Sequence, residues 1–273
     1  IQIDPAGTHG CSQVRPIQVK REMLFVQRAG LKIRAMGYDG SNDSYKSPDI
    51  TTLAGQITAS GIASMAVQQE PEPIVWIALN SGRLLSVTFD RDLEIIAWND
   101  HETDGAVESL AVIPSGSEEQ VWMIVRRSVN GVFVRYVERM KSSWYPIYGT
   151  AIPSLDVFPP GDYPVDWGFT LDCAITADDA AGKAIWDVPH LKGKTVRCLA
   201  DGVDMPPMVV NASTGQVTLP RNAKRVLIGL MYKPTIITLT PEMQTGTGSM
   251  QSDALSINEA VVRVHNTISM TVN

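Results

Sequence analysis

Three segments in the first half of the chain share one pattern of apolar and polar positions. Each has a run rich in β-branched and aromatic residues, then a short polar turn that contains glycine, then a second run of the same kind. Such runs on both sides of a glycine turn are typical of β-hairpins. The three predicted hairpins are MLFVQRAGLKIRAMGYD at 23–39, IVWIALNSGRLLSVTFD at 74–90 and QVWMIVRRSVNGVFVRYVE at 120–138.

The large aromatic residues of this region recur at a regular spacing. Trp76 and Trp122 are 46 residues apart, and Trp98 and Trp144 are also 46 apart. A degenerate first copy would place Phe25 in the position of Trp76, at a step of 51 residues. We expect these residues to pack one repeat on the next. The predicted turn glycines of the three hairpins are Gly30, Gly82 and Gly131.

A repeating unit of about 46 residues with four short strands is typical of a β-propeller blade. The first copy departs from this pattern, since PDITTLAGQI at 48–57 is expected to form one short helix in place of a clean fourth strand. About three blades are expected, whereas a closed propeller needs about four or more. The missing blades would either precede Ile1, which the absence of an initial Met favours, or be replaced by packing against something else.

The rest of the chain predicts a second β-rich region. We expect propeller-like blades over 1–144, a proline-rich linker or extended loop over 145–170 and a small β-sandwich or barrel over 171–243, where short strands alternate with Gly, Asn and Pro turns. Residues 244–273 would be a linker and the start of a further β segment. The predicted fold class is therefore all-β.

The stretch HETDGAVESLAVIP at 101–114 gathers four titratable residues: His101, Glu102, Asp104 and Glu108. A metal or acid/base site is one interpretation. The other is the connection between two blades, in which Asp104 begins a turn with glycine, Glu108 lies on a strand, and His101 and Glu102 lie in a solvated loop. We favour the connection, because one histidine beside carboxylates is a weak zinc pattern.

Composition narrows the possible functions. The chain has 273 residues, of which 44% are hydrophobic and 19% charged, which is ordinary for a folded protein. The net charge of −6 argues against a function in binding nucleic acid tightly. No apolar run approaches the roughly 20 residues of a membrane-spanning helix. The three cysteines are far apart, and we expect them to be reduced thiols without a metal.

Motifs that would identify a catalytic site do not occur in the sequence. It contains no Gly-x-Ser-x-Gly, no His-Glu-x-x-His, no phosphate-binding loop and no dinucleotide fingerprint. The basic spots Lys20-Arg21, Arg126-Arg127 and Arg139–Lys141 are interpreted as solvated hairpin ends. The chain is therefore expected not to be an enzyme and to hold no cofactor. The alternative is a propeller-type protein that binds or degrades glycans with paired carboxylates.

Several runs of the chain resemble the tail nozzle, or tail tubular B-type, proteins of short-tailed phages and related prophages. The most specific runs are FVQRAG, which begins at Phe25, and HETDGAVESLAVIP, which begins at His101. HLKGKTVRCLADG followed by GQVTLP resembles the β domain that comes next in that family. The resemblance covers roughly residues 7–240 and departs in the proline-rich insert at 145–168 and after Met243.

This resemblance implies a structural protein of the virion tail, assembled in the bacterial cytoplasm. Several copies, expected to be about six, would form a ring below the portal and adaptor through which the genome leaves. Partners implied are other copies of the chain, the tail adaptor, tail fibre or tip proteins, and genome DNA that passes without specific binding. No catalytic residue is implied. We expect the chain by itself to be monomeric, since ring contacts would draw on the full protein and the adaptor.

Overall fold

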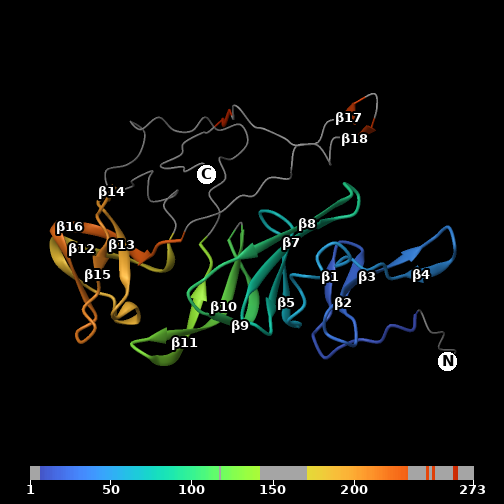
Figure 1. The fold of residues 1–273 in the computed structure, drawn as a ribbon, viewed down its shortest axis with the longest axis horizontal. Helices are drawn as coiled ribbons and strands as arrows, with labels where there is room; N and C mark the ends of the chain where they lie inside the picture. Colours follow the sequence, from blue (N-terminus) through green and yellow to red (C-terminus); the bar gives the residue numbers. More distant parts are fainter. Residues whose placement is uncertain are drawn as a thin grey trace. The chain divides into compact units, whose positions relative to one another are not determined.

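The fold of the chain is all-β, as predicted. The computed structural model describes residues 7–116, 118–141, 171–232, 244–245, 248–249 and 261–263. Within these ranges the strands form antiparallel sheets, and the only helix is the short 3-10 helix η2 (Pro189–Leu191) (Figure 1). No helix among them has the length and apolarity that crossing a membrane requires.

Sheet 1 is a four-stranded antiparallel meander. Its strands follow the order of the chain and are β1 (Ile17–Val19), β2 (Glu22–Val26), β3 (Ile33–Asp39) and β4 (Ser44–Lys46). The short helix predicted at 48–57 is wrong: the segment is a run of turns. Asp49 Oδ1 accepts a 2.8 Å hydrogen bond from the Thr51 N–H, and such side-chain bonds together with β-branched residues and Gly55 disfavour a helix.

Sheets 2 and 3 repeat the meander. Sheet 2 has four strands, β5 (Ile62–Gln68), β6 (Ile74–Leu79), β7 (Leu84–Asp90) and β8 (Ile95–His101). Sheet 3 has three strands in the described residues, β9 (Ala106–Ser115), β10 (Glu118–Val129) and β11 (Val132–Arg139). The predicted fourth piece around Trp144 and the proline-rich region 145–170 lie outside the described residues.

Each sheet has two faces, because successive side chains of a strand point in opposite directions. We call the face that packs on the preceding sheet the trailing face and the face that packs on the following sheet the leading face. The leading face of sheet 1 (Leu24, Val26, Ile33) packs on the trailing face of sheet 2, which includes Val75 and Ile77. The leading face of sheet 2 packs on sheet 3 through a second apolar cluster that contains Trp76, Ala78, Leu84, Val107, Val121 and Val125.

A backbone hydrogen bond repeats at both junctions between sheets. The Gly30 carbonyl accepts from the Ile62 N–H at 2.9 Å, and the Gly82 carbonyl accepts from the Val107 N–H at 2.8 Å. Both glycines are hairpin turn residues with left-handed φ angles of +80° and +86°. A Cβ on Gly82 would lie 2.8 Å from the Ala106 Cα, so this position also needs glycine for close approach.

Sheet 4 follows the proline-rich region. Its two long strands, β12 (Asp172–Asp187) and β16 (Gln216–Leu230), pair along their length with bulges, and β16 also pairs with β13 (Thr195–Ala200). The short strands β14 (Val203–Asp204) and β15 (Met208–Val209) pair with β13. Sheet 4 has its own apolar core, centred on residues such as Trp186, Cys198 and Ile228. Residues 216–230, in a region where short strands alternating with turns were predicted, form the single long strand β16.

The chain divides into one compact unit over Ile1–Tyr232 and another over Lys233–Asn273. In the second unit the described strands are β17 (Gln244–Thr245) and β18 (Gly248–Ser249), which form a small hairpin at the start of residues 244–273, the region predicted to be a linker and the start of a further β segment. No sheet of the described residues closes on itself. That sheets 1 to 3 belong to a propeller, and sheet 4 to a sandwich or barrel, is therefore a proposal.

Candidate functional site

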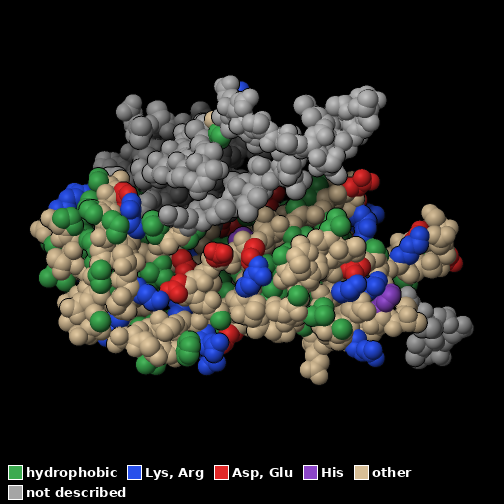
Figure 2. All heavy atoms as spheres, in the orientation of Figure 1, with side chains coloured by type: hydrophobic (Ala, Val, Ile, Leu, Met, Phe, Trp, Pro, Cys, Tyr) green, Lys and Arg blue, Asp and Glu red, His purple; other side chains and the backbone are tan. Residues whose placement is uncertain are grey.

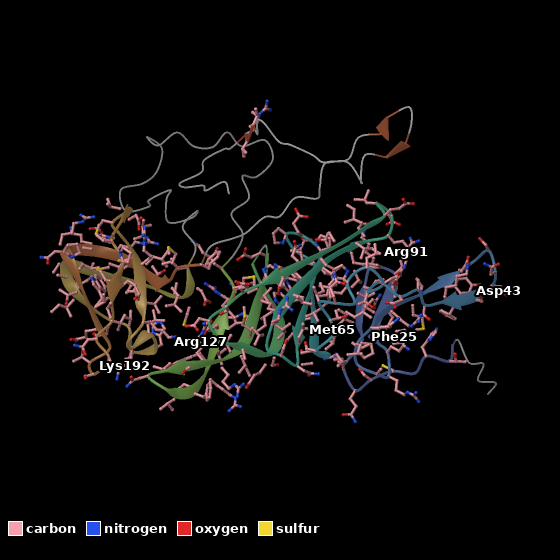
Figure 3. The ribbon with its side chains drawn as sticks, viewed as in Figure 1. Phe25, Asp43, Met65, Arg91, Arg127 and Lys192 are labelled. Carbon is pink, nitrogen blue, oxygen red and sulfur yellow. The ribbon has the colours of Figure 1, made fainter. Side chains whose placement is uncertain are left out.

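One charged side chain, Arg127 on β10, is buried among the described residues. Its side chain is only 4% exposed, and it lies where sheet 3 meets the start of β12 (Figure 3). The guanidinium donates Nε to Glu138 Oε1 at 2.5 Å and Nη2 to Glu138 Oε2 at 2.6 Å. This two-point geometry is the strong form of an arginine–carboxylate pair.

The same guanidinium joins three parts of the chain. It donates to both carboxylate oxygens of Asp172, the first residue of β12, at 3.0 and 3.1 Å. Nη1 also donates to the Asp104 carbonyl at 2.8 Å, in the connection between β8 and β9. Arg127 therefore makes as many hydrogen bonds as a guanidinium has N–H groups, and it links sheet 3, the 102–105 connection and sheet 4.

Asp172 is held by donors from the connection as well as by the arginine. Thr103 Oγ1 and the Asp104 N–H each donate to its carboxylate at 2.8 Å. We call Arg127, Glu138, Asp172, Thr103 and Asp104 the Arg127 clamp. Burial by itself would raise the pKa of the Asp172 carboxyl, but these hydrogen bonds and the arginine charge outweigh it and lower the pKa.

The charge of Arg127 is stabilised by the same contacts. Burial disfavours the cation, whereas the hydrogen bonds from Arg127 to Glu138 and Asp172 favour it, and the guanidinium pKa is raised overall. Outside the buried part, Nζ of Lys194, the residue before β13, lies 2.8 Å from Asp104 Oδ2. The junction thus consists of ionised groups that satisfy one another.

Two side chains of reactive type lie beside the clamp. Burial raises the pKa of the Cys173 thiol to about 12, so the sulfur is protonated at neutral pH and is a poor nucleophile. His190 Nε2 donates to the Cys173 carbonyl at 3.1 Å, and burial lowers the pKa of the imidazole. Its ring packs edge-on to Tyr136, with ring centroids 6.4 Å apart. These contacts hold His190 and Cys173 as parts of the junction between sheets 3 and 4.

The four titratable residues of the 101–114 stretch do not converge on one point. Asp104 belongs to the clamp, whereas Glu108 on β9 pairs with Arg135 at 2.6 Å and with Arg126 at 3.4 Å. Within residues 7–116, 118–141, 171–232 and the short C-terminal pieces, no group of three His, Cys, Asp or Glu side chains could hold a metal ion.

His101 differs from its predicted position in a solvated loop. It is the last residue of β8 and is only partly exposed. Its Nε2 lies 2.8 Å from Ser86 Oγ, and its ring packs on Trp76 with centroids 5.1 Å apart. Burial lowers the pKa of the imidazole. Because β8 extends to His101, which pairs with Leu84, this side chain lies on the leading face of sheet 2.

Two of the predicted packing residues, Trp76 and Trp98, pack between neighbouring sheets. Trp76 is 5% exposed on the leading face of sheet 2, and its Nε1 donates to Gln68 Oε1 at 2.9 Å. Trp98 on β8 packs against the core between sheets 1 and 2. Trp122 is partly exposed on the leading face of sheet 3, with the Arg139 guanidinium 6.0 Å from its ring. Trp144 lies outside the described residues.

The predicted equivalence of Phe25 and Trp76 is one residue out of register. The turn glycine donates its N–H to the Gln27 carbonyl in the first hairpin and to the Leu79 carbonyl in the second. The structural step is therefore 52 residues rather than 51, and Leu24 occupies the position of Trp76. A slip of one residue exchanges the faces of a strand, so Phe25 lies on the trailing face of sheet 1.

The three predicted turn glycines are in hairpin turns with similar backbone angles. Gly30, Gly82 and Gly131 have φ values of +80°, +86° and +81°. Their surroundings differ, since a Cβ on Gly30 or Gly131 would meet nothing within 4 Å, whereas one on Gly82 would overlap Ala106. Gly82 is thus the one of the three turn glycines whose lack of a side chain the sheet junction requires.

Arg127 and its carboxylate partners are a site that was not predicted. The interpretation of Arg127 as part of a solvated basic spot at a hairpin end is wrong, because Arg127 is buried within β10. A signal was present: in QVWMIVRR the residue alternates in phase with Val121 and Val125, which places it on the apolar face of the strand. Its partner Asp172 could not be identified from the pattern, because it lies beyond the proline-rich region.

The comparisons with known proteins do not assign the chain to a family. A scan against protein-family models finds no match, and a search of curated proteins also finds none.

Proposed function

We propose that the chain is a non-enzymatic structural subunit of a short-tailed phage tail, of the nozzle type. Copies of it assemble laterally into a ring of about six, below the portal and adaptor, through which the genome leaves. Its partners are other copies, the tail adaptor and tail fibre or tip proteins, and its location is the virion tail.

The observation that carries this proposal is the position of the HETDGAVESLAVIP run. This run is the most specific part of the resemblance to nozzle proteins. In the fold it connects sheet 2 to sheet 3 and supplies Thr103 and Asp104 to the Arg127 clamp. His101 packs on Trp76, and Glu108 pairs with arginines of sheet 3. Its polar side chains thus have structural partners, as a joint of a scaffold protein would need.

The repeat of sheets supports a propeller architecture within this subunit. Sheets 1 to 3 have the same strand order, and the first strand of each later sheet contacts the first strand of the sheet before it. The two junctions also share the hydrogen bond from a strand N–H to a turn glycine carbonyl. We therefore infer that sheets 1 to 3 are successive blades of a partial propeller and that sheet 4 is the core of a small sandwich or barrel.

Charge is also compatible with a conduit for DNA. The chain carries a net charge of −6, and the visible face of the molecule intersperses basic with acidic side chains (Figure 2). Each contact between a basic side chain and a phosphate adds affinity that would slow a passing genome. An acidic subunit in which several arginines, such as Arg83, Arg91 and Arg135, are in ion pairs limits that affinity.

The test is to locate the protein in virions produced from the genome that encodes it. Quantitative mass spectrometry of purified particles should find about six copies per virion, and gold-labelled antibody against the chain should mark the tail. Absence from the particles would overturn the proposal. So would cleavage of host polysaccharide by the purified chain, if substituting a carboxylate abolished it, since that result belongs to the glycan-degrading alternative.

A further inference from the structure

The leading face of sheet 3 has an apolar centre that is exposed. Ile124 on β10 pairs directly with Val137 on β11, and the two residues are 38% and 71% exposed. The leading face of sheet 2, which contains Trp76, is by contrast covered by sheet 3. An exposed apolar centre on a sheet face is typical of an interaction surface.

Arginine side chains flank this centre in both directions along the strands. Toward the turn between β10 and β11, Arg126 pairs directly with Arg135 on the same face. In the other direction Arg139 pairs with Trp122. Because residues two apart on a strand are separated by about 7 Å, arginines lie about 7 Å to either side of the apolar centre.

The arginines of this face outnumber their acidic partners. Glu108 lies 2.6 Å from Nε of Arg135 and 3.4 Å from Nε of Arg126, so two arginines share one carboxylate. Like charges directly opposite on neighbouring strands destabilise a sheet, and a second anion would offset that repulsion. Within the part of the chain that the structure describes, Arg139 forms no ion pair. The other carboxylate of the face, Glu118, lies at its far end as the first residue of β10.

The side chains of the face favour a protein partner over a nucleic acid. Bases bind exposed aromatic rings by stacking, but the guanidinium groups of Arg126 and Arg139 lie over the rings of Phe133 and Trp122, at 5.1 and 6.0 Å. The aliphatic centre is stabilised only by an apolar partner that removes it from water. Arginine and aromatic residues are also enriched in the cores of protein interfaces.

We propose that the leading face of sheet 3 binds an acidic segment of a different protein. The segment places one apolar side chain on Ile124 and Val137. One of its carboxylates binds the pair of Arg126 and Arg135, and another binds Arg139. On a helix, residues four apart are separated by about 6 Å along the axis, which is close to the spacing of the arginines from the centre. The partner is therefore recognised by the order acidic, apolar, acidic at steps of four residues.

The test is titration of the full chain with a helical peptide of about 15 residues that carries Glu, Leu and Glu at steps of four. Isothermal calorimetry measures binding, and hydrogen exchange locates it. The peptide should bind and slow exchange in β10 and β11. A matched peptide with Gln in place of both Glu residues should bind at least about tenfold more weakly, because it lacks the charged hydrogen bonds to arginine.

A pair of arginine variants separates binding from folding. Arg139→Gln should weaken binding of the acidic peptide by about tenfold and leave binding of the Gln peptide unchanged, a pattern that loss of folding would not produce. Arg21→Gln is the matched control, since Arg21 is exposed in the turn between β1 and β2, and it should leave binding of both peptides unchanged.

Several results would overturn the proposal. They are absence of binding at millimolar peptide, equal binding of the two peptides, and tighter binding of an oligonucleotide to the same face. Self-association of the chain through this face would show that a second copy is the occupant. Binding that appears only after residues 145–168 are replaced by a Gly/Ser linker would show that this region, which contains three Asp and no Lys or Arg, is the occupant. Detection of the protein in virions tests the nozzle function separately, since this binding surface does not depend on it.

Discussion

Sheet 3 makes two contacts of opposite chemical character. Against sheet 2 it buries an apolar layer that includes Trp76, Val107 and Val125, closed by one backbone hydrogen bond at Gly82. Against the start of sheet 4 it uses the Arg127 clamp, in which an arginine is shared by two carboxylates. The apolar junction repeats between sheets 1, 2 and 3, whereas the clamp joins sheet 3 to the start of sheet 4.

The difference explains how a regular stack can be joined to an unrelated sheet. Apolar burial is favourable but non-directional, so a repeated stack needs the turn glycine contact to set its register. An ion pair with fixed geometry is directional, and it accepts only one arrangement of its partners. Its cost is that each member depends on the others, because an unpaired buried charge is strongly destabilising.

The largest expected effect comes from the apolar junction. Trp76→Ala should lower the free energy of unfolding by about 4 kcal/mol, because it leaves a large cavity between sheets 2 and 3. Trp122→Ala removes the residue at the equivalent position of sheet 3, where the face is open, and should cost about 1 kcal/mol. Urea titrations of the two variants provide the measurement. Equal losses would mean that the two faces are packed alike.

The next effect comes from the clamp. Arg127→Met should cost about 3 kcal/mol, because it leaves Glu138 and Asp172 partly buried without their cation. Arg126→Met changes the neighbouring exposed arginine and should stay within about 0.5 kcal/mol of the parent. Thermal unfolding and hydrogen exchange would both report the change, with exchange rising first at the start of β12. If protection of β12 is unchanged in the Arg127 variant, the clamp does not hold sheet 4.

A smaller difference should separate two turn glycines. Gly82→Ala and Gly131→Ala both place a Cβ on a residue with left-handed φ, which costs about 1–2 kcal/mol in each case. Gly82→Ala also forces a Cβ into Ala106 and should cost roughly 1–3 kcal/mol more. The two midpoints in urea give this difference directly. Indistinguishable midpoints would show that close approach at Gly82 contributes nothing.

The smallest effect is the acid sensitivity of the clamp. The folded state lowers the pKa of Asp172, so the stability from its ionised form is complete above its unfolded value of about 3.9 and is lost as the pH falls through the lowered folded value. Asp172→Asn should therefore reduce the loss of stability between neutral pH and about pH 3. Asp92→Asn, at an exposed carboxylate, is the control and should leave the acid dependence as in the parent.

The hairpins that form the apolar junctions could be predicted from the sequence, whereas the Arg127 clamp could not. Alternation and turn glycines predicted the three hairpins, because both signals are local. The predicted step of 51 residues between the first and second hairpins is wrong by one residue. The first hairpin loop differs in length from the second, and matching aromatic residues does not fix strand register. The contact between Arg127 and Asp172 could not be predicted from the sequence. The proline-rich region, which has no regular pattern, separates the two residues along the chain.

Electron cryo-microscopy of the tail in virions encoded by the same genome tests the central claim most directly. The account predicts sheets 1 to 3 of each copy stacked around the tail channel, with the Arg127 clamp linking sheet 3 to sheet 4. A tail in which this chain is absent from the channel wall, or forms a peripheral fibre with carbohydrate bound to it, would contradict the account.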